Sequence, residues 1–379
     1  LDPSLTLERY GPLLRSAAQG ENRSLENLVD AVQSFLGIDP ARLPADNAQR
    51  DALHAAIQSV SGGAATPADA RYLALAGQLR ILPADTQLAA LAREHFGALV
   101  ALQELAPLAL VARDAADASA RQALDTLWQT TRGADYAAWQ ADRNATAGAE
   151  AGFTRQWLDD RALLLQVIDR RNALPDAPSI VADSRHALDR VVELAYADPF
   201  DHALTTLLAW NPAGNAQGNA LSVRPRQRIA FGDDGANQLE GTSNLLGDHL
   251  YGGGGNDTLT GLSGNDYLEG GTGDDQYLFA DAFGVDTLSD ADGRGSILFD
   301  GQVLAGGHGS GSPNLWLGAD ATGRVTRYVV RDSRESSTGK QLVMARAGDP
   351  TNTVTVNHFD LAAATSAAGY LGIQLDDSQ

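Results

Sequence analysis

Acidic and amide side chains recur at a fixed spacing between residues 232 and 278. Aligned on glycine, this segment reads GDDGANQLE, GTSNLLGDHLY, GGGGNDTLT, GLSGNDYLE and GGTGDDQYL. The pattern is a nine-residue repeat with Gly at positions one and four, Asp or Asn at six and Leu or Tyr at eight, and the second copy is two residues too long. Each repeat therefore places a hard anionic oxygen beside a tight turn, which is the chemistry of an oxygen-only cation site.

The spacing predicts which carboxylates meet. Glycine in the turn permits positive φ, so the turn carbonyls can converge on a common centre. Two repeats make one turn of a coil, which places Asp257 above Asp275 and Asp248 above Asp266, each pair 18 residues apart. Two facing carboxylates with no basic neighbour are unfavourable without a cation. Oxygen ligands without nitrogen or sulfur suit Ca²⁺ better than Zn²⁺ or a transition metal, and a flexible site suits Ca²⁺ better than Mg²⁺.

The charge of the chain is concentrated on the same segment. The net charge is −20 over 379 residues. Residues 219–290 carry 12 acids and 3 bases, whereas residues 1–218 carry 27 acids and 18 bases and residues 291–379 carry 9 acids and 7 bases. This excess of acid argues against nucleic acid and anionic membranes as partners and favours cations. The absence of cysteine excludes disulfides, thiolate zinc sites and cysteine nucleophiles.

The repeat predicts a solenoid that positions these oxygens. Six residues of each copy form a turn and three form a short strand, and a fixed short period is typical of such coils. The single apolar side chain of each strand is expected to stack in a narrow interior. A flexible Gly-rich linker is the alternative, but five copies with the apolar residue in register favour the coil. These apolar residues are Leu239, Leu250, Leu259, Leu268 and Tyr277.

Residues 1–218 are predicted to form an all-α helical bundle of six to eight helices. Leu, Ala and Val recur there at three- and four-residue spacing. N-terminal capping signals occur at Ser24, Thr66, Asp85 and Asp183.

The apolar segment 96–112 has two interpretations. A membrane-active helix is one, but Glu104 and Pro107 interrupt it, so we expect a buried core helix. No run of 18 or more apolar residues predicts a membrane-spanning helix.

Residues 291–379 change to β-rich sequence. The segments GSILFDG, GRVTRYVVRD, KQLVMARAG and NTVTVNHFD alternate branched or aromatic residues with polar ones, and glycine-rich turns separate them. We expect an antiparallel sheet or sandwich that continues from the end of the solenoid.

The segment GGGGNDTLT-GLSGNDYLE-GGTGDD resembles the repeats-in-toxin (RTX), or haemolysin-type calcium-binding, proteins of bacteria. The resemblance covers residues 232–290 and implies a parallel β-roll. The expected fold is thus multidomain α + β. It has a helical domain at 1–218, an RTX calcium-binding β-roll at 219–290 and a C-terminal β-rich capping or secretion-associated domain at 291–379.

The resemblance implies about three to four Ca²⁺ ions, each held between turns one coil apart. Each ion takes carbonyls and the Asp of one turn together with carbonyls and the Asp of the next. The third site has Asn in place of one Asp and should be weaker, and the fourth leaves the repeat pattern. The implied ligand sets are Gly253, Gly255 and Asp257 with Gly270, Thr272 and Asp275; Asn244, Leu246 and Asp248 with Gly261, Ser263 and Asp266; Asp233, Gly235 and Asn237 with Gly252, Gly254 and Asp257; and Leu262, Gly264 and Asp266 with Asp286 and Asp290.

The resemblance further implies a role in secretion. Such repeats occur in the C-terminal portion of large bacterial proteins exported by the type I secretion machinery, so we expect a secreted or cell-surface location and folding on calcium outside the cell. One alternative is an adhesin or ligand-binding region, whose cell-surface or host ligand the sequence does not identify. Another is the support region of a cytotoxin or of a secreted enzyme such as a lipase-like hydrolase, with its active site upstream of Leu1. Neither HExxH nor GxSxG occurs, and no set of nucleophile, base and orienting residue is evident, so catalytic residues are not expected in this segment.

Overall fold

The computed structural model divides into two compact units. The N-terminal unit comprises Leu1–Ala145 and Gly152–Ala177, and the C-terminal unit comprises Thr146–Ala151 and Pro178–Gln379. The structure describes residues 79–83, 88–103, 105, 108–112, 116–144, 153–173, 191–197, 203–210, 226–243, 246–334, 336 and 338–377.

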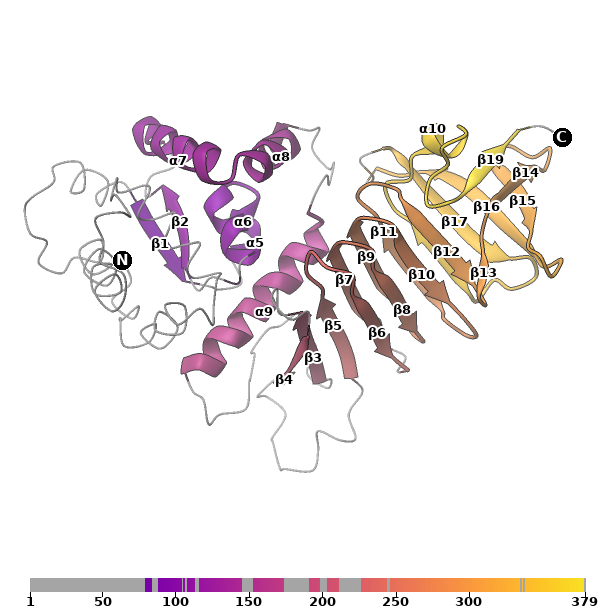
Figure 1. Ribbon diagram of the computed structural model, residues 1–379, viewed down its shortest axis with the longest axis horizontal. Helices are drawn as coiled ribbons and strands as arrows, with labels where there is room; N and C mark the ends of the chain where they lie inside the picture. Colours follow the sequence, from indigo (N-terminus) through magenta and orange to yellow (C-terminus); the bar gives the residue numbers. More distant parts are fainter. Residues whose placement is uncertain are drawn as a thin grey trace, which may run out of the picture. The chain divides into compact units, whose positions relative to one another are not determined.

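Helices dominate the described part of the N-terminal unit (Figure 1). They are α5 (Leu88–Ala92), α6 (Phe96–Gln103), α7 (Ala118–Thr131), α8 (Gly133–Asn144) and α9 (Arg155–Ala173). Helix α6 is apolar on all sides, and seven of its eight residues are buried, as expected of a helix inside a core. Aromatic rings pack around its first residue, Phe96, at centroid distances of 5.1–5.5 Å. These rings belong to Trp128, Tyr136 and Trp139.

The helical prediction for this part of the chain is correct only in part. The helices predicted from Ser24 and Thr66 lie outside the described residues. The single helix predicted over residues 96–112 is wrong beyond Gln103, because Leu108–Ala112 forms strand β2, antiparallel to β1 (Leu79–Pro83). Pro107 disfavours continuation of the helix. Among the described residues, no helix is long and apolar enough to span a membrane.

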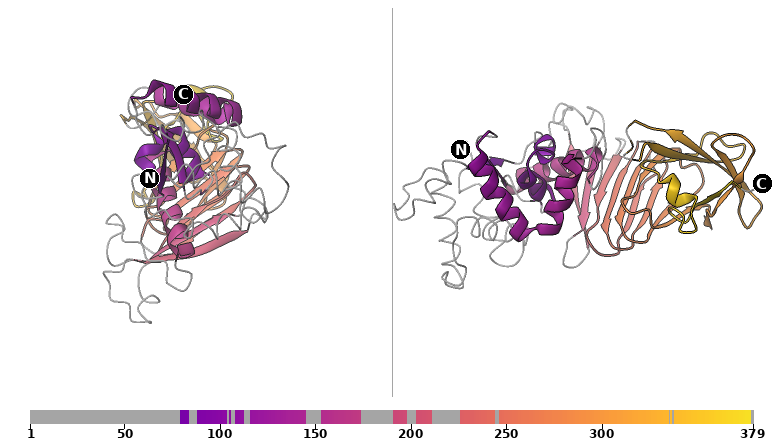
Figure 2. Two further views of the ribbon diagram at one scale, coloured as in Figure 1. Left: turned by 90° about the vertical axis from the view of Figure 1, so that its left-hand side faces the viewer. Right: turned by 90° about the horizontal axis from the view of Figure 1, so that it is seen from above.

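Successive strands of the repeat region alternate between two parallel sheets, so the chain forms a two-sheet coil (Figures 1 and 2). Strands β5, β7, β9 and β11 lie in one sheet, and β6, β8, β10 and β12 lie in the other. The strands are β5 (Arg226–Phe231), β6 (Gln238–Thr242), β7 (His249–Gly254), β8 (Thr258–Leu262), β9 (Tyr267–Thr272), β10 (Asp275–Phe279), β11 (Val285–Ser289) and β12 (Gly295–Phe299). This arrangement fits the β-roll that the resemblance implies.

The coil interior is the predicted column of apolar side chains. Leu239, Leu250, Leu259, Leu268 and Tyr277 are each at most 2% exposed. Strand register aligns Leu239 with Leu259 and Leu250 with Leu268. The single inward residue of each short strand therefore supplies the core.

Two further strands extend the larger sheet of the coil. Strand β3 (Val191–Ala197) pairs in parallel with β5, and β4 (Leu204–Trp210) pairs antiparallel to β3. The prediction of helix after Asp183 is therefore wrong over 191–197. The sequence VVELAYA satisfies a helical pattern as well as a strand pattern, and pairing with β5 decides for the strand.

The prediction that GSILFDG belongs to the C-terminal antiparallel sheet is wrong, because this segment forms β12 of the coil and pairs in parallel with β10. The residues that follow form antiparallel strands, as predicted, and continue the larger sheet. They are β14 (Gly306–Gly309), β15 (Leu315–Ala319), β16 (Val325–Asp332), β17 (Lys340–Arg346) and β18 (Thr353–Val356), and β18 pairs in parallel with β11 of the coil. Strand β19 (Gln374–Asp376) pairs with β14, strand β13 (Gln302–Val303) pairs with β12, and α10 (Leu361–Ala364) is a single turn.

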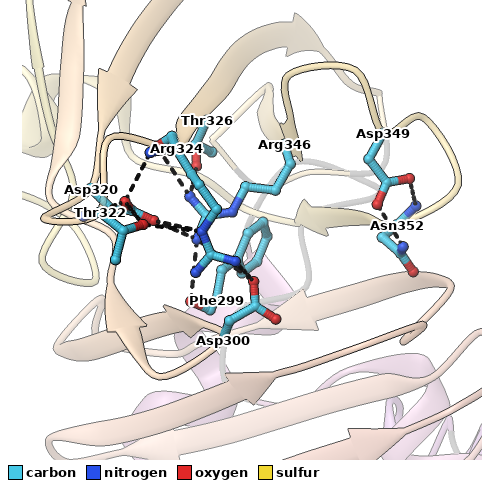
Figure 3. A network of polar contacts seen from close by, with 9 residues as sticks. All are labelled: Phe299, Asp300, Asp320, Thr322, Arg324, Thr326, Arg346, Asp349 and Asn352. Atoms are coloured by element: carbon cyan, nitrogen blue, oxygen red, sulfur yellow. Dashed lines mark hydrogen bonds and ion pairs between the residues drawn. The ribbon is translucent and has the colours of Figure 1, made fainter.

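A buried guanidinium joins these strands to the end of the coil (Figure 3). Arg346 forms an ion pair with Asp320 at 2.9 Å and donates a hydrogen bond to the carbonyl of Phe299 at 3.2 Å. Its guanidinium also lies 5.4 Å from the centroid of the Phe299 ring. On the same side, Arg324 forms an ion pair with Asp300 at 2.6 Å. These contacts fix β16 and β17 against β12.

Candidate calcium sites

The turns of the coil stack in two columns, one at each edge of the paired sheets. The first column contains turns 232–237, 252–257 and 270–275. The second contains turn 243–248, described except at residues 244 and 245, and turns 261–266 and 281–286. The strand register advances by 20 residues from β6 to β8 and from β9 to β11. It advances by 18 residues from β7 to β9 and from β8 to β10.

The last residues of the turns form a hydrogen-bonded ladder in each column. In the first, the N–H of Asn237 donates to Asp257 Oδ1 and the N–H of Asp257 donates to Asp275 Oδ1, both at 2.8 Å. In the second, the N–H of Asp248 donates to Asp266 Oδ1 at 2.7 Å and that of Asp266 donates to Asp286 Oδ1 at 2.9 Å. The ladder thus contains four stacked pairs, the same four that the implied ligand sets name.

The second carboxylate oxygen of most ladder residues is left for another partner. Oδ2 of Asp257, Asp266, Asp275 and Asp286 is buried and accepts no hydrogen bond in the described structure. Asp248 differs, since its Oδ2 accepts the N–H of Thr242. Buried acceptors of this kind are costly unless they are paired, so the four oxygens fit a cation.

Burial makes the ladder carboxylates hold protons when no cation neutralises them. It is the largest cause that raises the pKa of Asp257 and Asp266 to about 7 and of Asp286 to about 8. The same cause raises the pKa of Asp248 and Asp275. Repulsion from the neighbouring ladder residue adds to the shift, as from Asp275 on Asp257 and from Asp248 on Asp266. A divalent cation among these residues would replace the protons and cancel the repulsion.

Glycine at position one lies directly beneath the ladder carboxylate in the turns that begin at Gly252, Gly261 and Gly270. A Cβ on Gly252 would collide with Asp257 Oδ2 and the Gly270 carbonyl, and a Cβ on Gly270 would collide with Asp275 Oδ2. The reason for glycine here is this close approach. Positive φ instead occurs at positions two and four, for example at Gly253 (φ 100°) and Gly255 (φ 96°). The expectation of positive φ at position four is confirmed at Gly255, Gly264 and Gly273 but not at Gly235, and that for position one is wrong.

Backbone carbonyls line the space between successive turns. The carbonyl oxygens of Gly253 and Gly255 lie against Gly271 and Gly273 of the next turn. In the second column, those of Leu246 and Gly264 lie against Gly264 and Gly284, respectively. Carbonyls and carboxylates without nitrogen or sulfur are the ligands that Ca²⁺ prefers. Among the described residues, no group of three or more His, Asp or Glu side chains gathers as a metal cluster, and a site of this kind needs only two carboxylates.

The predicted ligand residues fall into three groups. The first group consists of two residues that do not join the ladder. Asn244 lies outside the described residues, and the carboxylate of Asp290 accepts hydrogen bonds from the Tyr277 hydroxyl at 2.6 Å and the Gly293 N–H at 2.6 Å. One is strained, since Leu262 has φ 68° at position two, where two turns of the first column have Gly253 and Gly271. The remainder lie in the two columns; they are Asp233, Gly235, Asn237, Leu246, Asp248, Gly252, Gly253, Gly254, Gly255, Asp257, Gly261, Ser263, Gly264, Asp266, Gly270, Thr272, Asp275 and Asp286.

The asparagines that precede two of the ladder residues, Asp257 and Asp266, have a role that the sequence interpretation missed. Asn256 Oδ1 accepts the N–H of Asp274 in the next turn at 2.9 Å, and Asn265 Oδ1 accepts the N–H of Val285 at 3.1 Å. These amides tie consecutive turns together beside the ladder. The repeated Asn-Asp pair in GGGGNDTLT and GLSGNDYLE was the available signal.

A parallel two-sheet coil with carboxylates stacked in its turns defines a cation-binding repeat protein. Residues 243–277 match the family of RTX calcium-binding nonapeptide repeats, in its four-copy form. Residues 243–277 are therefore RTX-type calcium-binding repeats, as the resemblance indicated. A comparison with curated proteins found no match.

Proposed function

We propose that the coil holds four Ca²⁺ ions, one at each stacked pair of the ladder, and that these ions drive the folding of the C-terminal unit. The four buried Oδ2 atoms without hydrogen-bond partners carry this proposal. The ligands would be the ladder carboxylates and the turn carbonyls of the implied sets. Bound Ca²⁺ supplies the positive charge that stabilises the ionised carboxylates in a buried position.

The linkage between ion binding and folding is large enough to act as a switch. Extracellular calcium modules bind with dissociation constants of roughly 10⁻⁴ to 10⁻³ M, so cytosolic calcium would add almost nothing to the stability. At 100 times the dissociation constant, each site contributes about 2.7 kcal/mol. Three such sites contribute about 8 kcal/mol, which is comparable to the whole stability of a domain.

This switch suits a protein that is exported unfolded. Residues 219–290 carry a net charge of −9, so the ion-free segment repels itself and resists collapse. On reaching a calcium-rich exterior, the segment would bind Ca²⁺ and fold, and the protein would then be extracellular or located at the cell surface. The proposed partner during export is the type I secretion machinery, and the coil would support the stability of the protein to which it belongs.

The test is a calcium titration of the whole chain. Far-ultraviolet circular dichroism should show a gain of β signal between chelator and millimolar Ca²⁺, and equilibrium dialysis should count four ions per chain. Equal Mg²⁺ serves as the control and should produce much less of the signal, because Mg²⁺ demands a near-ideal octahedral site. A chain whose β signal in chelator equals that in Ca²⁺ would contradict calcium-driven folding.

A further inference from the structure

The last turn of the second column, residues 281–286, lies outside the matched repeats and is followed by no further repeat. Its final residue, Asp286, is 0% exposed, and Asp286 Oδ1 accepts the N–H of Asp266 at 2.9 Å. Oδ2 of both residues is buried and accepts no hydrogen bond in the described structure. This pair forms the fourth proposed calcium site, but no further repeat stacks on the turn that contains Asp286 to hold it in place.

A side chain from the C-terminal strands takes the place of that missing repeat. In the turn below, the N–H of Gly264 donates to the carbonyl of Phe283 in the next turn at 3.2 Å. The equivalent glycine of the last turn is Gly284, and its N–H donates to Asn352 Oδ1 at 3.0 Å, across 68 residues of sequence. Asn352 directly precedes β18, whose first residue, Thr353, donates its N–H to the Gly284 carbonyl at 2.8 Å.

Asn352 is itself held in one orientation (Figure 3). Its amide Nδ2 donates to Asp349 Oδ2 at 2.7 Å. Asp349 Oδ1 accepts the N–H and the hydroxyl of Thr351 at 3.0 Å and 2.6 Å. Hydrogen bonds from Asn352 and Thr351 lower the pKa of Asp349 to about 2, so this carboxylate stays ionised. With Nδ2 occupied, the amide oxygen of Asn352 faces Gly284.

The opposite column ends in the same way, which indicates a common device. The position-four glycine of its last described repeat is Gly273, and its N–H donates to Asp292 Oδ2 at 3.1 Å. Both Gly273 and Gly284 have positive φ, at 134° and 97°. Each column therefore ends with a side-chain acceptor supplied by a segment beyond the repeats.

We infer that Asn352 is a positioning residue for the calcium site at Asp266 and Asp286, which belongs jointly to the coil and to the C-terminal strands. The inference rests on the proposed function and deepens it. Asn352 fixes the turn whose carbonyls and carboxylate face the ion. By linkage, an ion at this site and the docking of β18 onto β11 stabilise each other.

The test compares calcium binding by the whole chain and its variants, using Ca²⁺ alone as the probe. Asn352→Leu removes the acceptor at similar volume and should weaken one of four sites by about tenfold, the usual effect of losing one buried hydrogen bond. The exchange of the two side chains in Asn352→Asp with Asp349→Asn keeps the oxygen that faces Gly284 and the amide-to-carboxylate hydrogen bond, so it should restore most of the affinity. The matched control is Asn357→Leu at the other end of β18, where Asn357 Oδ1 accepts from Gln341 at 3.1 Å; it should leave all four sites unchanged.

A double-variant cycle separates this role from general destabilisation. In an Asp286→Asn background, which removes the site, Asn352→Leu should cause no further loss of calcium affinity. Hydrogen exchange in the wild type gives a second measure, because the Gly284 amide should be protected in Ca²⁺ and exposed in chelator. Four unchanged sites in Asn352→Leu would overturn the inference alone. Equal protection of Gly284 in both conditions would contradict calcium-driven folding as well. A wild type that binds no calcium would overturn it together with the proposed function.

Discussion

Asp257 and Asp275 are joined by a backbone-to-carboxylate hydrogen bond of 2.8 Å, and Asp257 also accepts one from the N–H of Asn237 at 2.8 Å. Asp257 therefore belongs to two stacked pairs, whereas Asp275, at the top of its column, belongs to one. The same distinction separates Asp266 from Asp248 and Asp286 in the other column. Position in the ladder, rather than residue type, decides how many ions each carboxylate would hold.

Substituting an inner ladder residue should cost more ions than substituting an outer one. Asp257→Asn keeps the shape but removes the charge from two sites, so we expect two of the four sites to bind Ca²⁺ at least about tenfold more weakly. Asp275→Asn should weaken one site in this way. Equilibrium dialysis against ⁴⁵Ca²⁺ measures both counts. Equal losses in the two variants would contradict the assignment of Asp257 to two sites.

The site between Asn237 and Asp257 should bind calcium more tightly when residue 237 carries a carboxylate. Asn237 donates its N–H to Asp257 but supplies only an amide oxygen, Oδ1, which accepts the N–H of Asp233 at 2.8 Å. Asn237→Asp adds a full negative charge, so the affinity of this site should rise by about tenfold, since calcium affinity follows ligand charge. Isothermal titration calorimetry measures the change.

The same Asn237→Asp variant should be less stable than the wild type in chelator, because it buries one more unpaired carboxylate. A variant that is stabilised in both conditions would show that residue 237 acts through something other than an ion. Glu240→Gln provides a control, since this exposed side chain lies beside the ladder but outside it.

Two glycines of the same turn, Gly252 and Gly254, should respond very differently to alanine. A Cβ on Gly252 would collide with Asp257 Oδ2 and the carbonyl of Gly270, whereas a Cβ on Gly254 has ordinary neighbours at 3.5 Å. We expect Gly252→Ala to destabilise the calcium-bound chain by about 2–4 kcal/mol and Gly254→Ala by less than about 1 kcal/mol. Denaturant unfolding in excess Ca²⁺ gives both values, and similar costs would contradict close approach as the reason for Gly252.

The repeat region could be predicted from sequence because its period fixes both the fold and the site. Once residues 18 apart are aligned, the apolar column and the pairs Asp248–Asp266 and Asp257–Asp275 follow directly. Asp286 pairs with Asp266 at a spacing of 20, because the coil from β9 to β11 is two residues longer than two nonapeptides. Here the family ligand scheme, rather than the period, indicated the pair.

Other features depend on contacts that no local pattern encodes. Residues 191–197 satisfy a helical pattern, and only pairing with β5 makes them a strand. Asn352 lies 68 residues from Gly284, so its capping role appears only in three dimensions. Asp290 fits the acidic pattern of the repeats, yet the Tyr277 hydroxyl engages it instead of the ladder.

The Tyr277 hydroxyl should contribute to stability without affecting the ion count. It donates to Asp290 Oδ2 at 2.6 Å and accepts the N–H of Gly270 at 2.9 Å inside the coil. Tyr277→Phe leaves both partners buried and unpaired, so we expect a loss of about 2–4 kcal/mol with four ions still bound. Tyr267→Phe is the control, because that hydroxyl is partly exposed, and it should cost less than about 1 kcal/mol. Gain of a fifth ion in Tyr277→Phe would instead assign a calcium role to Asp290.

The pH dependence of stability should reverse when calcium is added. The pKa of Asp257 and Asp266 is raised from 3.8 to about 7 and that of Asp286 to about 8, first of all by burial. Because the folded state binds these protons more tightly, their contribution is full below pH 3.8 and is lost as pH rises to about 8. In chelator, the coil should therefore keep most of its structure near pH 5, and its melting temperature should fall by about 5 °C or more towards pH 8, where the ion-free coil is expected to be largely unfolded.

With Ca²⁺ in excess, the ion competes with the protons, so the melting temperature should rise over the same range. Asp320 and Asp349 do not interfere, because their pKa values are lowered to about 2 and their contribution is lost only at lower pH. Differential scanning calorimetry at pH 5, 6, 7 and 8 tests both slopes. Asp257→Asn should flatten both slopes, since it removes one titrating ladder residue. A melting temperature in chelator that rises from pH 5 to pH 8 would show that the ladder carboxylates are not buried as described.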